Sequence, residues 1–436
     1  MSLKNISEKT LQLLLKNGAQ QAQVISSHTL LEELQYENND FTLLRSVEDQ
    51  SCDLTAITEK KKGSYSVSRT DDHSLNEAVA KTIEMAKSAQ EDEAHAIATE
   101  KDQVEKAYEN FESGPKEADL DEMTKLIQHF VRDTHQKYPQ IGLRTIGVKF
   151  IQSKIHYLNS HGIEVTSSKG YYSFSVMFNA NEKEKSSSMD FDSLSFTEFD
   201  ERIQNLLAPE NFGDKFKHTI SHLHAHKYDK SFTGKAIFMP KCWYTFVQMI
   251  NGHLTTGPLL AGTSKLQGKI GEKVGSSLFH IESRPHSPLF AVPSIMTGEG
   301  IFTKELTIFD EGVLNTYLVD LYGRNKLGLK EVSNFASHLY MPAGKTSLED
   351  MISDIEEGIL IGRFSGGAPN SNGDFSGIAK NSFIIKDGKI AQPLSETMIS
   401  GNLFDLTQEI YDTSAEVYQN GSFYFPYVAT AGITIS

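Results

Sequence analysis

A short stretch near the amino terminus, TAITEKKKGSYSVS (residues 55–68), indicates how the first part of the chain folds. Two runs rich in β-branched and aromatic residues flank EKKKG (residues 59–63), a polar segment that contains glycine. This pattern is typical of two antiparallel strands joined by a turn. Residues 6–19, which end at Asn17-Gly18, and residues 74–90 both carry apolar side chains at helical intervals. A hairpin between two helices predicts an α+β fold in which helices pack on an antiparallel sheet.

The sequence after the second helix predicts more of the same architecture. A helical pattern over residues 120–136 leads into three strand-like runs, with a turn at Asn159-Ser160-His161-Gly162 and further alternation at residues 171–178. Residues 91–122 are strongly acidic and contain Gly114-Pro115. We interpret this acidic segment as a solvated connection that separates two subdomains.

The composition changes near residue 227, where glycine and short strand-like runs become frequent. Residues 309–313 and 385–390 each place an Asp-containing glycine turn between alternating apolar residues, which predicts two hairpins. We therefore expect an α+β amino-terminal region over residues 1–226 and a β-rich carboxy-terminal domain over residues 227–436.

Charge and composition exclude several classes of protein. The 436 residues include 42 Lys and Arg against 57 Asp and Glu, a net charge of −15 that disfavours direct binding to nucleic acid or to anionic membranes. No apolar run is long enough for a membrane-spanning helix, and the amino terminus lacks an export signal. Two distant cysteines, Cys52 and Cys242, form neither a disulfide framework nor a zinc cluster. We expect a cytoplasmic protein.

Searches for familiar site motifs identify no metal or nucleotide site. The segment AGKTS (residues 343–347) resembles the end of a phosphate-binding loop but lacks the first glycine of that motif. The sequence has one cluster of histidines, made of His218, His222, His224 and His226. Their spacing does not let one regular helix or strand point all four at a single metal, and we interpret them as surface residues. The run WYTFVQMINGH (residues 243–253) has one apolar stripe and predicts a buried helix that ends at Gly252.

Several ordered motifs resemble the TldD/PmbA family, whose PmbA members are also called TldE and are named as modulators of DNA gyrase. The motifs are GEG (298–300), DEGVLNTYLVDLYGRNKLGLK (310–330), SGGAPNSNGDFSGIAKNSFIIKDGKIAQP (365–393) and SETMISGNL (395–403). The amino-terminal helix, hairpin and helix also resemble the first domain of that family. The resemblance implies a cytoplasmic metallopeptidase system that acts on unfolded peptides.

In the TldD branch, a helix carries HExxxH and a late cysteine completes a zinc site. Matching this chain to that pattern places Gln248 and Met249 where His-Glu should be, His253 at the second histidine and Asn420 at the cysteine. An amide and a thioether do not replace an imidazole ligand and a carboxylate base. The resemblance therefore implies that this chain holds no zinc or other cofactor, and that zinc belongs to a TldD-like partner.

The helical geometry of HExxxH adds one condition. A spacing of five residues turns about 140° away from one face, so both histidines can share a metal only where the helix breaks, and Gly252 offers such a break. On its own, His253 is interpreted as a hydrogen-bonding residue at the helix end.

The resemblance implies a PmbA/TldE-like subunit that pairs with a TldD-like homologue or with itself and helps to hold an unfolded peptide. The glycine-rich segment 365–377 is the predicted contact surface, through Gly366, Gly367, Asn372, Gly373 and Asp374. Two alternatives stay open at this point. One is an autonomous homodimeric peptidase that uses a different metal site, drawn from His218 to His226; the other is a non-enzymatic binding protein that modulates DNA gyrase.

Overall fold

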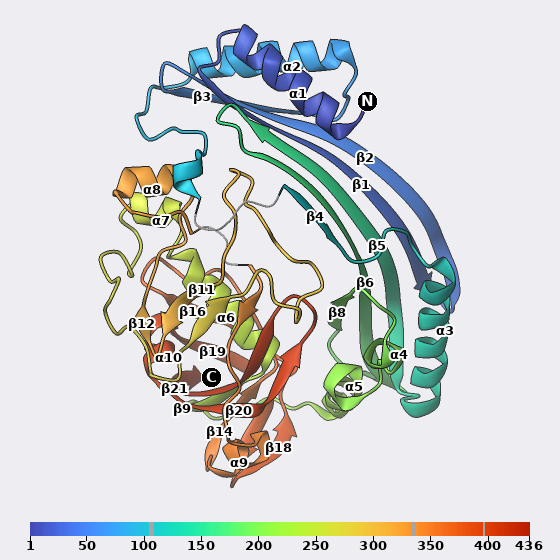
Figure 1. The fold of residues 1–436 in the computed structure, drawn as a ribbon. Coiled ribbons are helices and arrows are strands. Elements are labelled where there is room, and N and C mark those ends of the chain that lie inside the picture. Colours follow the sequence, from blue (N-terminus) through green and yellow to red (C-terminus); the bar gives the residue numbers. More distant parts are fainter. Residues whose placement is uncertain (104–108, 334–336, 396) are drawn as a thin grey trace.

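The computed structural model describes residues 1–103, 109–333, 337–395 and 397–436 and contains two large β-sheets (Figure 1). The strands of the first sheet run in the order β3-β2-β1-β5-β6-β4, with β7 and β8 also paired to β6. Their bounds are β1 (Gln21–Glu37), β2 (Asp40–Thr58), β3 (Lys61–Val67), β4 (Asn110–Ser113), β5 (Ile141–Asn159), β6 (Glu164–Glu182), β7 (Lys185–Ser186) and β8 (Asp190–Phe196).

Helices cover this first sheet at both ends, and the long strands β1, β2, β5 and β6 bend together as an arch between them (Figure 1). One end packs on α1 (Leu3–Lys16) and α2 (Asp72–Ser88) through a core of small and branched side chains. The other end packs on an aromatic core beneath α3 (Leu120–Lys137), α4 (Glu201–Gln204) and α5 (Asp214–Ser221). Single turns of helix, η1 (Glu100–Asp102), η2 (Pro209–Gly213) and η3 (His222–His224), occur in the connections.

The second sheet belongs to the carboxy-terminal half and lies on the concave side of the arch (Figure 1). Its main path is β12-β11-β10-β13-β21-β9-β14-β17-β18, with β15, β16, β19 and β20 paired beside it. The bounds are β9 (Phe232–Phe238), β10 (Ile281–Ser283), β11 (Leu306–Asp310), β12 (Val313–Leu314), β13 (Leu339–Tyr340), β14 (Glu357–Ile361), β15 (Arg363–Gly366), β16 (Asp374–Lys380), β17 (Phe383–Lys386), β18 (Lys389–Pro393), β19 (Thr397–Asn402), β20 (Ile410–Gln419) and β21 (Tyr424–Ile435).

In the described part of the chain, five helices accompany the second sheet. These helices are α6 (Pro240–Gly252), α7 (Thr256–Leu260), α8 (Leu321–Leu327), α9 (Leu348–Ser353) and α10 (Leu403–Gln408). The largest hydrophobic core of this half packs around α6, and the fully buried Trp243 and Phe246 of that helix lie against the sheet. Of the helices in the described residues, none is long and apolar enough to cross a lipid bilayer.

The α+β class predicted from the sequence is confirmed, as are the first hairpin and the helices beside it. β2 and β3 pair antiparallel, and Glu59 and Lys60 make the turn between them with φ of 49° and 61°. The prediction of three strand-like runs after α3 is wrong, because the residues form two long strands, β5 and β6. Their middle parts are half exposed on one face, so polar residues interrupt the apolar pattern without ending the strand.

The interpretation of residues 91–122 as a solvated connection also needs correction. Asp102 forms an ion pair with Arg324 at 2.6 Å, and Asp92 forms one with Lys326 at 2.8 Å. Ala98 between them is fully buried. Two acidic side chains of this segment, Asp92 and Asp102, therefore bind basic side chains of α8, whereas others such as Glu91, Glu112 and Glu117 are exposed as predicted. Residues 104–108 lie outside the described part.

Candidate functional site

Helix α6 carries the residues that the sequence places at the centre of the site. It follows β9 directly, and Pro240 occupies its first turn, where a missing N–H costs no hydrogen bond. Trp243, Phe246 and Ile250 bury one side of the helix in the core. The opposite side, which includes Gln248, faces solvent, so the core determines which residues the helix presents outward.

The two positions matched to His-Glu have no metal-binding chemistry in this structure. The Gln248 amide donates a hydrogen bond to the Tyr244 hydroxyl at 2.8 Å. Met249 is partly buried and packs against the carboxy-terminal core. A neutral amide and a thioether do not fit a zinc ion and its catalytic base.

Helix α6 ends at Gly252, as the sequence predicts, and His253 occupies its carboxy-terminal cap. The backbone of His253 has φ of −72° and ψ of −15°, which are right-handed angles. The ring packs edge-on against Phe404 at 5.0 Å between centroids. The backbone N–H of His253 donates to the Ile250 carbonyl at the helix end, whereas its buried Nδ1 has no hydrogen-bond partner within the described residues. Burial lowers the pKa of the imidazole.

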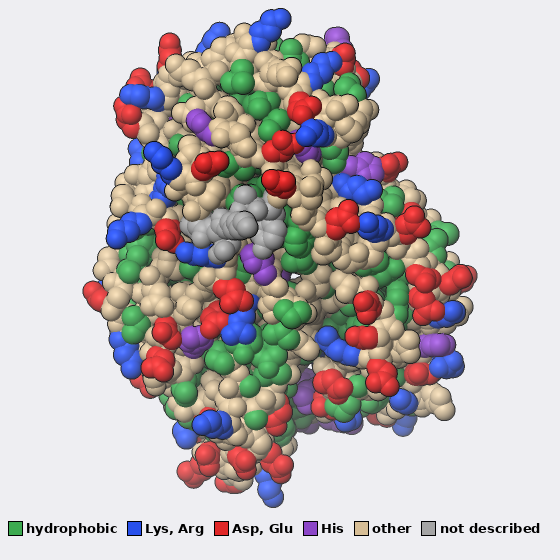
Figure 2. Space-filling view, viewed as in Figure 1, with side chains coloured by type: hydrophobic (Ala, Val, Ile, Leu, Met, Phe, Trp, Pro, Cys, Tyr) green, Lys and Arg blue, Asp and Glu red, His purple; other side chains and the backbone are tan. Residues whose placement is uncertain are grey.

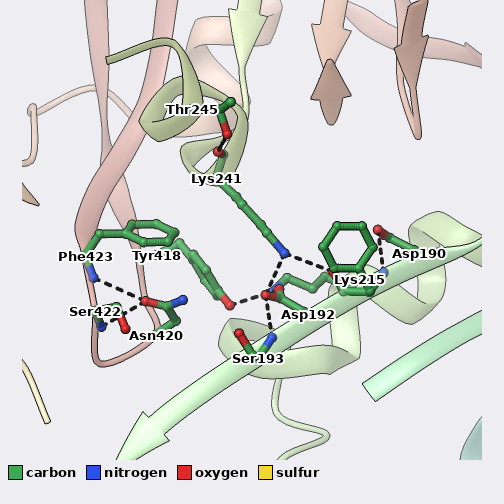
Figure 3. A network of polar contacts seen from close by, with 11 residues as sticks. Asp190, Asp192, Ser193, Lys215, Lys241, Thr245, Tyr418, Asn420, Ser422 and Phe423 are labelled. Atoms are coloured by element: carbon green, nitrogen blue, oxygen red, sulfur yellow. Dashed lines mark hydrogen bonds and ion pairs between the residues drawn. The ribbon is translucent and has the colours of Figure 1, made fainter. Parts of the chain in front are cut away.

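Asn420 lies in the tight turn between β20 and β21. Its Oδ1 accepts hydrogen bonds from the backbone N–H groups of Ser422 at 3.0 Å and Phe423 at 3.2 Å (Figure 3). The Phe423 ring stacks on Tyr244 of α6 with centroids 4.2 Å apart. The turn thus contacts α6 through the Phe423 ring, while the Asn420 side chain stabilises the turn by hydrogen bonds to its backbone.

The glycine-rich segment forms the turn between β15 and β16. The Asn370 side chain accepts from the N–H groups of Asn372 and Asp374, at 2.9 and 3.0 Å. Gly373 has φ of +92°, and a Cβ there would lie 2.7 Å from the Phe404 ring. Since Phe404 also contacts His253, this turn and the end of α6 both lie next to the same aromatic ring.

Within this segment the two leading glycines differ. Gly366 pairs with Gly377 in the β15–β16 ladder, and a Cβ on Gly366 would lie 2.4 Å from Phe364. Gly367 follows in open space. Asp374 is exposed, and its carboxylate accepts hydrogen bonds from the amides of Asn402 and Asn370, which lower its pKa.

A hollow of about 690 Å³ opens at the end of α6. Its walls carry mostly amide, hydroxyl and glycine groups, together with the Asp320 carboxylate and Leu318. They come from α6, from α7, from the loop before Gly300 and from the residues before and after α8, and include Gln248, Thr256, Thr297, Gly298, Asp320 and Ser337. Gly298 of the GEG segment and Asp320 of the DLYGRN segment therefore line the same hollow as Gln248, although about 50 to 70 residues separate them from Gln248 in sequence.

Interactions between domains hold the GEG loop in place. The Tyr157 hydroxyl of β5 donates to the carbonyl of Glu299 at 3.1 Å, and Gln103 donates to the carbonyl of Gly300 at 2.9 Å. The Glu299 carboxylate accepts from the N–H of Leu321 at 2.9 Å, and burial raises the pKa of this carboxyl. The first sheet thus forms one support of the hollow.

The histidines near residue 220 do not assemble into a metal site. His222 is buried, and its Nδ1 and Nε2 lie within hydrogen-bonding distance of the carbonyl oxygens of His218 and Ser382, at 2.7 and 3.0 Å. His224 and His226 are exposed, so the surface interpretation holds for these two and is wrong for His222. Among the described residues, no group of three or more His, Cys, Asp or Glu side chains lies close enough to hold a metal.

Sequence reasoning missed a buried ionic cluster at the junction of the two sheets (Figure 3). Asp192 of β8 is 4% exposed and binds Lys215 of α5, Lys241 of α6 at 2.9 Å and the Tyr418 hydroxyl of β20 at 2.9 Å. A cavity of about 920 Å³ opens beside it. The partners lie 23, 49 and 226 positions from Asp192, so no local pattern announces the cluster.

Comparison with known proteins identifies the family. The PmbA/TldA metallopeptidase central domain matches residues 113–218, and the C-terminal domain of the same family matches residues 231–436. The chain belongs to the PmbA/TldD family. A relative named Metalloprotease PmbA homolog, from Buchnera aphidicola, is 27% identical over 285 residues. That match spans 62% of this chain and 62% of the relative.

Solved structures of PmbA/TldD-like proteins share the fold over nearly the whole chain. A candidate modulator of DNA gyrase from Bacteroides thetaiotaomicron superposes with a TM-score of 0.85 at 23% identity, over 99% of this chain and 98% of that one. TldE from Thermococcus kodakarensis superposes with a TM-score of 0.83 at 19% identity, over 98% of this chain and 99% of that one. At these identities the likeness concerns the fold.

Charged side chains of both signs lie on the face of the molecule drawn in Figure 2. Figure 2 shows acidic and basic side chains intermixed over the face that it presents, with apolar groups between them. The net charge of −15 is consistent with this distribution.

Proposed function

We propose that this chain is a PmbA/TldE-like, non-zinc subunit of a cytoplasmic TldD/TldE-type metallopeptidase and that it holds unfolded peptides for a TldD-like partner. The observation that carries the proposal is the hollow at the end of α6. Family segments surround it, yet Gln248 and Met249 stand where the family pattern needs an imidazole and a carboxylate.

The lining of this hollow supports peptide binding. Hydroxyl and amide groups such as those of Thr256, Thr297 and Gln248 can exchange hydrogen bonds with a peptide backbone without selecting a particular side chain. The turn at Gly366 to Asp374 and the end of α6 both lie next to Phe404, and the turn is therefore the proposed continuation of the peptide surface. Pairing with an exposed strand edge would add affinity.

Zinc content and reconstitution of cleavage test this proposal. We expect less than about 0.1 zinc per chain in protein purified without a metal-affinity column, because the matched positions supply one imidazole where a tetrahedral site needs about four ligands. We expect cleavage of an unfolded peptide only after addition of a TldD-like homologue, and its loss with a chelator. Chelator-sensitive cleavage by this chain alone would contradict the proposal.

The hollow itself is tested with Gln248→Ala in the reconstituted pair. Loss of a backbone-binding amide should raise KM several-fold while complex formation stays unchanged. Thr245→Ala, on the exposed side of the same helix but away from the hollow, is the matched control and should leave KM unchanged.

A further inference from the structure

A cavity of about 920 Å³ lies beside the Asp192 cluster, where the two halves of the chain meet. Its walls come from β8, η2 and α5 of the first half and from α6, β15 and β20 of the second half. Within the described residues, it shares no lining residue with the hollow at the end of α6. Cavities of this size commonly bind small molecules.

Much of the cavity wall is apolar. Aromatic and aliphatic side chains line it from both halves; they include Phe191, Met239, Leu348, Phe364, Val417 and Tyr427. Phe191 is 48% exposed, and its ring lies below two cations, Lys241 at 4.7 Å and Arg363 at 5.5 Å from the ring centroid. An apolar group of a ligand would remove part of this wall from water, which stabilises binding.

The two lysines of the cavity are already compensated by the protein. Lys215 and Lys241 both bind the Asp192 carboxylate, and Lys241 also donates to the carbonyl of Phe191 at 2.9 Å. These cations therefore do not select the charge of a ligand. Three acids of the lining are exposed to solvent, where their charges are screened; they are Glu210, Asp214 and Glu416.

Two opposite charges of the lining, Asp190 and Arg363, form no ion pair in the described part of the chain. The Asp190 carboxylate accepts a hydrogen bond from the N–H of Phe191 at 2.9 Å (Figure 3). Arg363 donates through Nη2 to the carbonyl of Met189 at 3.3 Å, which places the guanidinium beside the residue before Asp190. Burial raises the pKa of the Asp190 carboxyl, and the nearby charges of Lys241 and Arg363 do not outweigh this effect.

Three further polar atoms of the lining are buried without a hydrogen-bond partner among the described residues. Two are donors, Arg363 Nε and Asn381 Nδ2, and one is an acceptor, Asn211 Oδ1. Asn211 is 1% exposed, and its Nδ2 donates to the carbonyls of Arg202 and Asn205, both at 3.1 Å, so the oxygen is the free end of the amide. Buried polar atoms without partners destabilise a protein, so a ligand that supplies their partners gains affinity.

These groups match a ligand that carries two opposite charges close together. Asp190 and Asn211 offer acceptors for an ammonium group, while Arg363 and Asn381 offer donors for a carboxylate. An α-amino acid carries its ammonium and its carboxylate on one carbon atom. This arrangement suits two protein charges that are neighbours but do not pair with each other.

We propose that the cavity beside Asp192 binds a free α-amino acid with an apolar side chain, with its ammonium at Asp190 and its carboxylate at Arg363. The apolar wall receives the side chain. The proposal does not rest on the peptide function, because the hollow at the end of α6 is lined by other residues. Its test uses binding to this chain alone, whereas the peptide function is tested by zinc content and reconstituted cleavage.

Calorimetric titration of the full chain with L-phenylalanine and L-leucine tests the ligand class. We expect a Kd of about 0.1 mM or lower for these amino acids. Phenylalaninamide lacks the carboxylate and 3-phenylpropionate lacks the ammonium, so each should bind about tenfold more weakly or worse than phenylalanine. No binding of either amino acid at about 10 mM, or equal affinity for these two analogues, would overturn the proposal.

Two further probes test the apolar side chain and the closeness of the two charges. L-Aspartate should bind about tenfold more weakly than phenylalanine, because its side-chain carboxylate would be buried against an apolar wall. The tripeptide Phe-Gly-Gly should also bind about tenfold more weakly, because it separates the ammonium from the carboxylate. Affinity of either probe equal to that of phenylalanine would overturn the assignment to a free apolar amino acid.

Two variants of the full chain assign the charges to their residues. Arg363→Gln should weaken phenylalanine binding about tenfold and abolish its advantage over phenylalaninamide, while its advantage over 3-phenylpropionate persists. Asp190→Asn should abolish only the advantage over 3-phenylpropionate. A general loss of folding does not produce this exchange of preferences.

Asp214→Asn is the matched control, because Asp214 is an exposed acid of the same lining and already pairs with Lys217. It should change the affinity for phenylalanine less than about twofold. Preferences that change alike in Arg363→Gln and Asp190→Asn, or an equal loss of affinity in Asp214→Asn and Asp190→Asn, would overturn the proposal.

Discussion

At the scale of single residues, Asp192 is a buried carboxylate that binds two lysine side chains, Lys215 and Lys241. Burial alone would raise the pKa of this carboxyl, but the charges of Lys215 and Lys241 outweigh that effect and hold the pKa at about 2. Tyr418 donates a third interaction from the second sheet. One carboxylate therefore joins both halves of the molecule.

Replacing Asp192 by Asn should destabilise the protein by about 3 kcal/mol, since it leaves two partly buried ammonium groups without their counter-charge. Urea unfolding at pH 7 measures this difference. Asp214→Asn, which breaks an exposed pair with Lys217, is the control and should cost less than about 0.5 kcal/mol.

The same variant predicts a dependence on pH. The pKa of Asp192 is lowered in the folded state, so its stabilisation is complete above the ordinary value of 3.8 and is lost as the pH falls through about 2. The difference in unfolding free energy between the unmodified chain and Asp192→Asn should shrink between about pH 4 and pH 2. A difference that stays constant over this range would contradict the assignment of charge.

At the scale of elements, the GEG loop depends on one left-handed residue. Gly300 has φ of +81°, and a Cβ there would lie 2.2 Å from the Tyr157 hydroxyl oxygen. Gly18, at the end of α1, has φ of +101° but open space around it. Both glycines need a positive φ, but only at Gly300 would an added Cβ clash with a neighbouring side chain.

Gly300→Ala should therefore cost about 1 to 3 kcal/mol more than Gly18→Ala, because only the first displaces a fully buried ring. Thermal or urea unfolding of both variants measures the difference. Equal losses would mean that Tyr157 moves away freely and that the loop is not held by the first sheet.

At the scale of the whole molecule, the acidic connection fastens the two halves together. The Arg324 and Asp102 side chains are only 15% and 14% exposed, so their ion pair is shielded from solvent. The Asn325 amide donates to the carbonyl of Ala94 at 2.9 Å and adds a neutral contact. Local opening of the connection must break these contacts together.

Arg324→Gln should raise amide exchange in residues 91–103 about tenfold, in line with the loss of a charged hydrogen bond of about 1.5 kcal/mol. Hydrogen exchange with mass spectrometry reads this segment directly. Lys304→Gln, which breaks the more exposed pair with Glu331, is the control and should leave the exchange unchanged.

The sequence by itself determined the local elements of this protein. The β2–β3 hairpin and the helices α1, α2 and α3 follow from turn chemistry and periodicity, which involve neighbours within about four residues. The β-rich character of the second half could be predicted for the same reason, because strands and turns also have local sequence patterns. The family motifs were readable because they are ordered runs of residues.

The tertiary structure alone decided how distant residues meet. The end of α6 meets α10 only in the folded chain, where the His253 ring packs against Phe404. The Asp192 cluster joins residues up to 226 positions apart, and Asp92 and Asp102 of the acidic connection bind α8. Periodicity describes which side of an element is apolar, but a contact between two elements depends on where the chain places both, and that is a property of the whole fold.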